Sequence, residues 1–206
     1  TVAFFLLFAF ACGEARLERL IQKADDEWIK GRNHSAAEIL KSVLEEQSSG
    51  PMEEEALFRL GEIHYFSLAN SAHALNYFDE LLRLNKKGKF GYQAQKYIAE
   101  IVEFTVKDYD QAVIEYQKLI NDFGREEDNP GHQYRIAAVY YKKQDYDQAL
   151  IELETVLEKY PKSPLSEESF YKATSILYTL GRCPEVRQRY GGFMEKYPKS
   201  KFRGEM

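Results

Sequence analysis

The string Asp-Tyr-Asp-Gln-Ala occurs twice in this chain, at residues 108–112 and again at residues 145–149, which are 37 positions apart. A second string, Tyr-Pro-Lys-Ser, occurs at residues 160–163 and 197–200, and its two copies are also 37 positions apart. Two unrelated strings that recur at one spacing indicate an internal repeat, and periods of about 20–50 residues are typical of solenoid proteins.

The alanine that ends the first string marks one position in each repeat. These marker positions are Ala36, Ala74, Ala112, Ala149 and Val186. The residues four, seven and eight positions after each marker are all apolar or aromatic, and such offsets lie on one face of an α-helix. A second amphipathic segment precedes each marker, as at residues 56–66 and 134–141, and a short turn separates the two. Small residues such as Gly61 and Ala137 fall where the paired helices must approach closely.

This pattern resembles the tetratricopeptide repeat (TPR). The fourth repeat carries the likeness best, through Ile136, Ala137, Tyr140, Tyr146, Ala149, Leu153, Val156 and Pro161. The resemblance implies an all-α fold, a right-handed TPR superhelix (an α-solenoid) of about five helix–turn–helix repeats of 37–38 residues. We expect a solenoid over residues 12–206, with repeats at approximately 15–50, 51–88, 89–127, 128–164 and 165–201.

Residues 1–11 are uncharged and apolar, and as a helix they span about 16 Å, roughly half the hydrocarbon core of a bilayer. They are therefore predicted to be a signal segment. The sequence Ala9-Phe10-Ala11-Cys12 resembles a bacterial lipoprotein signal, which implies a lipid anchor at Cys12. Cleavage to a soluble secreted form, or a short buried helix containing Cys12, are the alternatives. The residue after Cys12 is Gly13, and not the aspartate that resembles an inner-membrane retention signal. The resemblance therefore implies the outer membrane, with the protein on its periplasmic face.

The connectors Tyr-Pro-Lys-Ser-Pro and Tyr-Pro-Lys-Ser resemble those of bacterial envelope TPR proteins of the BamD (outer-membrane assembly) and YbgF (Tol-Pal-associated) types. The resemblance implies a non-enzymatic protein–protein interaction scaffold, lipid-anchored in the periplasm, with other envelope proteins or peptides as partners. Its favoured place is an outer-membrane protein assembly complex. A Tol-Pal or peptidoglycan-associated adaptor, and the TPR module of a larger envelope protein truncated after residue 206, are the alternatives.

The inner surface of a stacked TPR array is made largely by the first helix of each repeat. Tyr134 and Tyr171, like Tyr141 and Tyr178, stand at equivalent positions one repeat apart and are expected to be neighbours. With Phe58, Tyr65 and Phe66 of the second repeat, they are predicted to form an aromatic ladder that faces a partner-binding groove. The alternative is that these rings fill the seam between helices.

Several classes of function are not expected. The net charge of −5 argues against nucleic acid as the main partner. His34, His64, His73 and His132 lack the spacing of a metal site and are expected to be solvated or to cap helices. With no phosphate loop or nucleophile motif, we predict no catalytic residue, cofactor, metal or small-molecule substrate.

Two further expectations concern Cys183 and the chain ends. Cys183 is expected to be half-buried at a packing position, with redox chemistry as the alternative. The abrupt start at Thr1 and the nine residues after Tyr197 indicate a fragment, or a last helical face that docks on another protein or a second copy.

Overall fold

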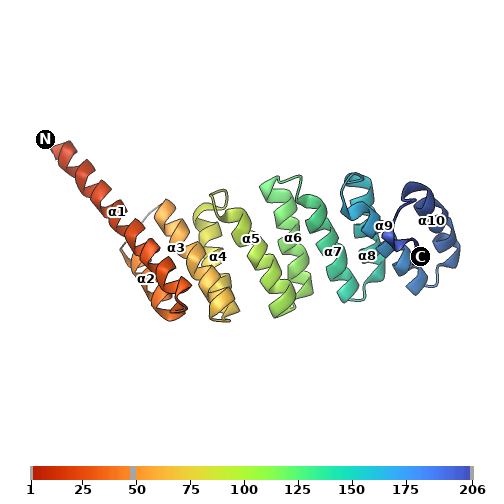
Figure 1. Ribbon diagram of the computed structural model, residues 1–206, viewed down its shortest axis with the longest axis horizontal. Helices are drawn as coiled ribbons and strands as arrows, with labels where there is room; N and C mark the ends of the chain where they lie inside the picture. The colour runs from red at the N-terminus through yellow and green to blue at the C-terminus, as the bar shows by residue number, and fades with distance from the viewer. Residues whose placement is uncertain (1, 47–49, 205–206) are drawn as a thin grey trace. The chain divides into compact units, whose positions relative to one another are not determined.

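The computed structural model describes residues 2–46 and 50–204, with side chains described from Gly13 onward, and all regular structure in these residues is helical (Figure 1). The α-helices are α1 (Val2–Ile29), α2 (Asn33–Glu45), α3 (Pro51–Glu62), α4 (Ser71–Asn85), α5 (Gly91–Glu100), α6 (Tyr109–Phe123), α7 (Asn129–Lys142), α8 (Tyr146–Lys159), α9 (Leu165–Thr179) and α10 (Cys183–Lys196). Two π-helical segments, η1 (Ile63–Ser67) and η2 (Ile101–Val106), extend α3 and α5, and a 3₁₀ turn, η3 (Lys201–Gly204), follows α10. The predicted end of the signal segment, at residue 11, falls inside α1.

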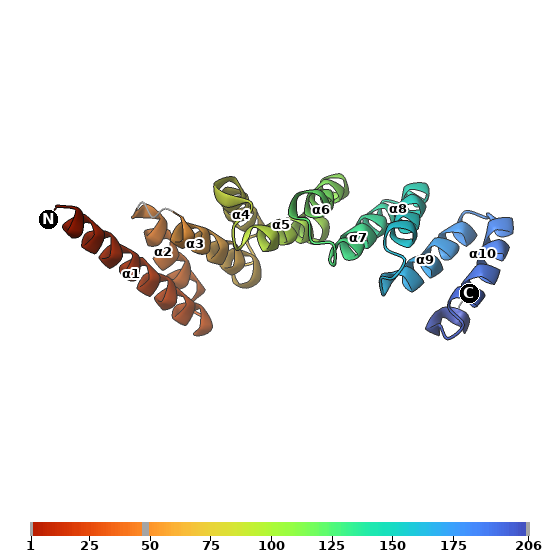
Figure 2. The same ribbon diagram turned by 90° about the horizontal axis from the view of Figure 1, so that it is seen from above.

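The chain divides into two compact units, residues 1–101 and residues 102–206. The first contains α1 to α5, and the second contains α6 to α10. Within each unit consecutive helices pack against one another, and in the second unit α7, α8 and α9 lie side by side in chain order (Figure 2). The helix–turn–helix alternation through five pairs confirms the fold class that the sequence predicts.

Residues of the two repeated strings set the helix boundaries. Asp108 and Asp145, the first residues of the Asp-Tyr-Asp-Gln-Ala strings, are N-caps whose side chains accept hydrogen bonds from the amides of Gln111 (3.0 Å) and Gln148 (3.2 Å). In the connector, the hydroxyl of Ser163 accepts a hydrogen bond from the amide of Leu165 at 3.2 Å. Ser200 makes the same contact with the amide of Phe202 at 3.0 Å. The strings therefore recur because each fixes one turn of the repeat.

The marker positions and the positions seven residues after them belong to the buried core. The four marker alanines are fully buried, and so are the residues seven positions after every marker, Val43, Leu81, Leu119, Val156 and Phe193. The fifth repeat departs from the pattern: Val186 is only half-buried, and Tyr190 is 43% exposed. Helix α8 packs between α7 and α9, whereas α10 packs against α9. The outer side of α10 is therefore less covered than that of α8 by the residues that the structure describes.

Gly61 gives a direct test of the close helix approach. A Cβ atom added at Gly61 would lie 2.6 Å from Cδ1 and Cζ of Phe78, whose ring is fully buried in α4. We predict that Gly61→Ala lowers the free energy of unfolding by about 1–3 kcal/mol, because the ring has no space to move into. Denaturant unfolding followed by circular dichroism measures this.

Gly192→Ala is the matched control, because a Cβ at Gly192 in α10 meets only Phe170 Cζ, at an ordinary 4.0 Å. This variant should be neutral or stabilise the protein by up to about 1 kcal/mol through better helix propensity. Equal effects of the two substitutions would contradict the close approach at Gly61.

Candidate functional site

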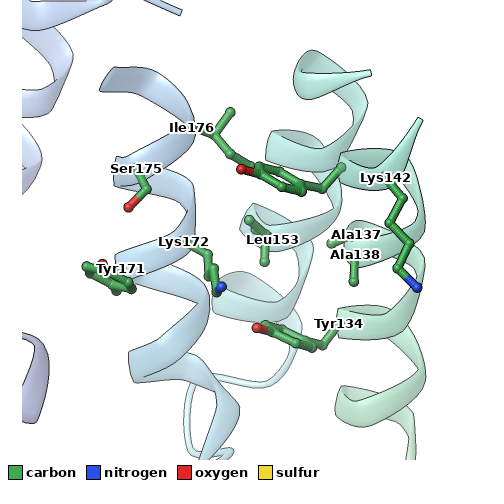
Figure 3. Close-up of a pocket in the computed structure, with 10 residues that line it drawn as sticks. Tyr134, Ala137, Ala138, Lys142, Leu153, Tyr171, Lys172, Ser175 and Ile176 are labelled. Atoms are coloured by element: carbon green, nitrogen blue, oxygen red, sulfur yellow. The ribbon is translucent and has the colours of Figure 1, made fainter. Parts of the chain in front are cut away.

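A pocket of about 340 Å³ opens between α7 and α9 in the second unit (Figure 3). Ten residues line it: Tyr134, Ala137, Ala138, Tyr141, Lys142, Leu153, Tyr171, Lys172, Ser175 and Ile176. Figure 3 shows Tyr134 on α7 and Lys172 on α9 extending from facing helices into the space between them, with Leu153 of α8 behind. Because α7 and α9 are first helices of consecutive repeats, the pocket lies where a TPR array presents its inner surface.

The floor of the pocket belongs to the hydrophobic core. Ala137, Leu153 and Ile176 are buried and pack in one cluster with Ala149 and Ala173. Above this floor, Ala138 and Ser175 contribute only small, half-buried side chains. The pocket exists because small residues stand at these places, where larger ones would fill the space between α7 and α9.

The pocket lining carries positive charge. Lys142 and Lys172 are the ionised side chains among the ten, and no carboxylate lines the pocket. The ammonium of Lys142 lies 2.7 Å from Glu103 Oε1. Lys172 is exposed, and none of the residues that the structure describes pairs with it. The chain as a whole carries −5, so this local balance runs against the average of the molecule.

Beside the pocket, the carboxylate of Glu103 in η2 is completely buried. It accepts hydrogen bonds from the hydroxyl of Tyr116 (2.7 Å), from Lys142 (2.7 Å) and from the Arg135 guanidinium. Burial by itself opposes ionisation of Glu103, but the bonds from Arg135, Lys142 and Tyr116 outweigh it and hold its pKa below the usual value. The cluster ties η2, α6 and α7 together and fixes the position of Lys142.

Phe104, the residue after Glu103, is 49% exposed and is held by the same two cations. The guanidinium carbon of Arg135 lies 4.8 Å from the ring centroid, and the ammonium of Lys142 lies 4.6 Å from it. Such distances are typical of cation–π contacts. An aromatic ring with adjacent positive charge therefore continues the surface next to the pocket.

Tyr134 is held in place by a hydrogen bond to α9. Its hydroxyl donates a hydrogen bond of 2.8 Å to Oε1 of Glu168 in α9. Burial, together with this bond to a carboxylate, raises the pKa of Tyr134 above its usual value, so the phenol stays protonated and remains a donor. The bond joins α7 to α9 across one end of the pocket.

The second unit brings together three of the four tyrosines that the sequence assigns to a groove. Tyr134, Tyr141 and Tyr171 all line the pocket, whereas Tyr178 is 73% exposed and is not part of the lining. Within the described residues no ring contact joins Tyr134 to Tyr171 or Tyr141 to Tyr178. Tyr171 instead stacks on Phe202, with centroids 4.6 Å apart, and Tyr141 packs edge-on against Tyr146 at 5.3 Å.

The three aromatic residues predicted from the second repeat lie in the first unit. The prediction that Phe58 faces a groove is wrong, because its ring is 6% exposed and stacks on Phe90 inside the core, with ring centroids 4.6 Å apart. Phe66 is 57% exposed and Tyr65 is half-buried, with the two rings 4.7 Å apart. Phe66 also meets Tyr97 edge-on at 5.3 Å. Tyr65 and Phe66 thus remain accessible to a partner, and Phe58 does not.

Phe104 was not among the predicted site residues, although the sequence contains a signal for it. Phe104 stands 38 positions after Phe66 and 37 before Tyr141, and Tyr178 follows 37 later. All four rings are large and exposed in the structure, and Ile29 stands at the same place in the first repeat with 84% exposure. Alignment on this position, near the end of each first helix, would have identified Phe104.

The cysteines and histidines differ from expectation in part. The side chain of Cys12 lies outside the residues whose side chains are described. Cys183 is exposed, not half-buried, because it is the first residue of α10.

His64 and His132 are buried and not solvated, because both lie on core-facing sides of their helices. His64 stacks on His73 at 5.1 Å, and burial, then the neighbouring His73, lowers its pKa. Within the described residues no cluster of three potential ligands could hold a metal ion.

Comparison with known proteins agrees with this architecture. Residues 91–205, more than half of the chain, match the family model described as YfiO, outer membrane lipoprotein. The chain belongs to the YfiO family. Residues 21–88 of this YfiO-family chain match a tetratricopeptide-repeat model. No curated protein sequence matches the chain.

Solved structures show the same fold at low sequence identity. A tetratricopeptide repeat protein from Parabacteroides merdae is 20% identical with a TM-score of 0.63, and the match covers 89% of this chain and 68% of that one. MamA is 17% identical with a TM-score of 0.62, covering 89% and 92%. YrrB, described as a TPR protein with an unusual peptide-binding site, is 14% identical with a TM-score of 0.58, covering 90% and 89%.

These comparisons confirm that the YfiO-family chain is an all-α TPR protein that resembles BamD. The TPR fold is a scaffold for protein interaction. The family is one of outer membrane lipoproteins. In the part of the chain that the structure describes, no helix has the length and apolar character that crossing a bilayer requires.

The Glu103 cluster predicts a pH-dependent contribution to stability. At neutral pH, Glu103→Gln should lower the free energy of unfolding by about 1–3 kcal/mol, because two partly buried cations lose their partner. Since folding lowers the pKa of Glu103, its contribution is present above the unfolded value of about 4.3 and is lost as the pH falls below it, through the folded value. The difference between variant and parent should therefore shrink by about pH 3.

Urea unfolding at the two pH values, followed by circular dichroism, measures that difference. Glu158→Gln is the control, because Glu158 is exposed near the end of α8. A Glu103 effect that is the same at both pH values, or no larger than the Glu158 effect, would contradict the ionised cluster.

Proposed function

We propose that this chain is a non-enzymatic protein–protein interaction scaffold, lipid-anchored through Cys12 on the periplasmic face of the outer membrane, and a component of an outer-membrane protein assembly complex. Residues 1–11 act as the signal segment, and residues 12–206 form the TPR solenoid. Its partners are other envelope proteins or peptides, with no nucleic acid and no small-molecule substrate among them.

One observation carries the proposal. The segment that matches the outer membrane lipoprotein family, residues 91–205, contains the whole of the α7–α9 pocket and its Glu103 support. The part of the chain that is most similar to the family is thus also the part that presents an open, aromatic and cationic surface. The described peptide-binding site of YrrB, a protein of the same fold, supports a peptide as the kind of ligand.

The lipid anchor is supported by the order of residues at the start of the chain. An apolar, uncharged run ends in Ala9-Phe10-Ala11, and Cys12 follows directly. Acylation at several positions of one cysteine gives stable attachment, whereas a single chain gives only marginal binding. A chain held in this way needs no membrane-spanning helix.

Partner contact should be confined to the first-helix side of the repeats. We predict that a photo-cross-linking amino acid at Tyr141, within the pocket, forms covalent adducts with envelope proteins when the chain is expressed in a Gram-negative host. The same amino acid at Tyr190, an exposed tyrosine on α10, is the matched control and should form few adducts. Gel mobility after irradiation measures both, and equal cross-linking at the two positions would argue against a groove.

The anchor has its own test in the same host. With an initiator Met and a short basic leader placed before Thr1, the chain should incorporate an alkyne-labelled palmitate and fractionate with outer membranes. Cys12→Ala should abolish the label, because Cys12 is the cysteine that directly follows the signal segment and carries the diacylglycerol thioether. Cys183→Ala, at the chain's other cysteine, should leave the label intact. Label that persists without Cys12, or none in the parent chain, would overturn the proposed anchor.

A further inference from the structure

The second unit contains a second hollow, which provides a contrast to the α7–α9 pocket. It has a volume of about 410 Å³ and lies between α8 and α10. Its arginines are already paired: Arg182 with Glu185 (2.6 Å) and Asp147 (3.9 Å), and Arg189 with Glu154. The lining has three carboxylates (Asp147, Glu154 and Glu185) against these two guanidiniums, so the hollow has no excess of positive charge to attract an anionic ligand.

The α7–α9 pocket has a different charge balance. Of its two lysines, Lys172 has no ion-pair partner within the described residues, and Lys142 shares the Glu103 carboxylate with Arg135. Two cations on one carboxylate leave one positive charge in excess, and Lys172 adds another. Glu168, which is engaged by Tyr134, offsets part of this charge at one end. The pocket therefore favours an anionic group near Lys172.

The rest of the lining is apolar and aromatic, so the pocket also favours an apolar group on its ligand. Leu153, Ile176 and Ala137 form an apolar floor, and rings from Tyr134 and Tyr141 flank it. The volume of 340 Å³ lies at the low end of the range of about 300–1,000 Å³ that is typical for ligand pockets. Such a space suits one or two side chains of a longer segment.

The chain itself provides an example of ring docking at the pocket rim. Phe202, from the segment after α10, stacks on the lining residue Tyr171 with an interplanar angle of 9°. Figure 3 shows Tyr171 on the side of α9 that faces away from α7, so Phe202 lies beside the pocket and not in the gap between α7 and α9.

We propose that the α7–α9 pocket binds an extended segment of a partner protein in which an Asp or Glu side chain stands next to a bulky apolar side chain. The carboxylate meets the ammonium of Lys172, and the apolar side chain lies over Leu153 and Ile176. This inference rests on the proposed function and specifies the chemistry of the ligand at that site.

The test is a selection of random peptides displayed on phage against the full purified chain. Enriched sequences should contain an Asp or Glu beside Leu, Ile, Phe, Tyr or Trp. Synthetic versions of the enriched peptides, labelled with a fluorophore, then give dissociation constants by fluorescence anisotropy. Binding should weaken with added salt, because one partner of the contact is exposed.

Two variants test separately the positive charge of Lys172 and the open volume of the pocket. Lys172→Met keeps the apolar stem and removes the charge, and should weaken binding about tenfold, as expected for one charge-assisted contact. Ser175→Leu fills the pocket and should weaken binding at least as much while both lysines remain. Lys159→Met, at an exposed lysine near the end of α8, is the control and should bind like the parent chain. Circular dichroism verifies that each variant is folded.

The outcomes distinguish the inference from the function on which it rests. Enriched peptides without acidic residues, or acidic peptides whose affinity is unchanged by Lys172→Met and Ser175→Leu, would overturn the ligand chemistry and leave a peptide-binding scaffold in place. Failure to enrich any peptide would contradict both the inference and a peptide-binding groove.

Discussion

Close approach of two helices at a buried small side chain is the constraint on which this structure depends. Ala36, Ala74 and Ala149 are fully buried where the second helix of a repeat packs on the first, and Gly61 plays the corresponding part against Phe78. Because a larger side chain would separate the helices, this contact fixes the geometry of the pair. Repetition of the pair every 37 or 38 residues then builds the core from neighbouring contacts alone, as in other solenoids.

The candidate site follows from the same packing. Helix α8 packs against both α7 and α9. On the other side of α8's contacts, α7 and α9 face one another across a gap whose width depends on the small residues Ala138 and Ser175. Charge then gives the gap its chemistry: Glu103, buried in η2, holds Arg135 and Lys142 on one side, while Lys172 stands on the other. In the function that we propose, these oriented side chains recognise the partner.

The fold could be predicted from the sequence because the spacing of apolar residues indicates which face of each helix is buried. Ala74 and Leu119 could be assigned to the core in this way without any knowledge of the residues that cover them. Tyr134, Tyr141 and Tyr171 were predicted from the same register. The π-helical segments could not be predicted, because no local sequence pattern signals them. One of them, η2, contains Glu103 and Phe104 and so determines where these side chains point. Phe58 was assigned wrongly because periodicity places it on the first helix but does not say that Phe90 covers it.

Native-state hydrogen exchange measured by mass spectrometry tests the central claim most directly. If each second helix is stabilised by the first helices on both sides, α8, packed between α7 and α9, should exchange far more slowly than α10, which packs against α9. The segment with Ala149 and Val156 should rank among the slowest of the second unit. Exchange of α8 as fast as that of α10 would contradict an array built from neighbouring contacts.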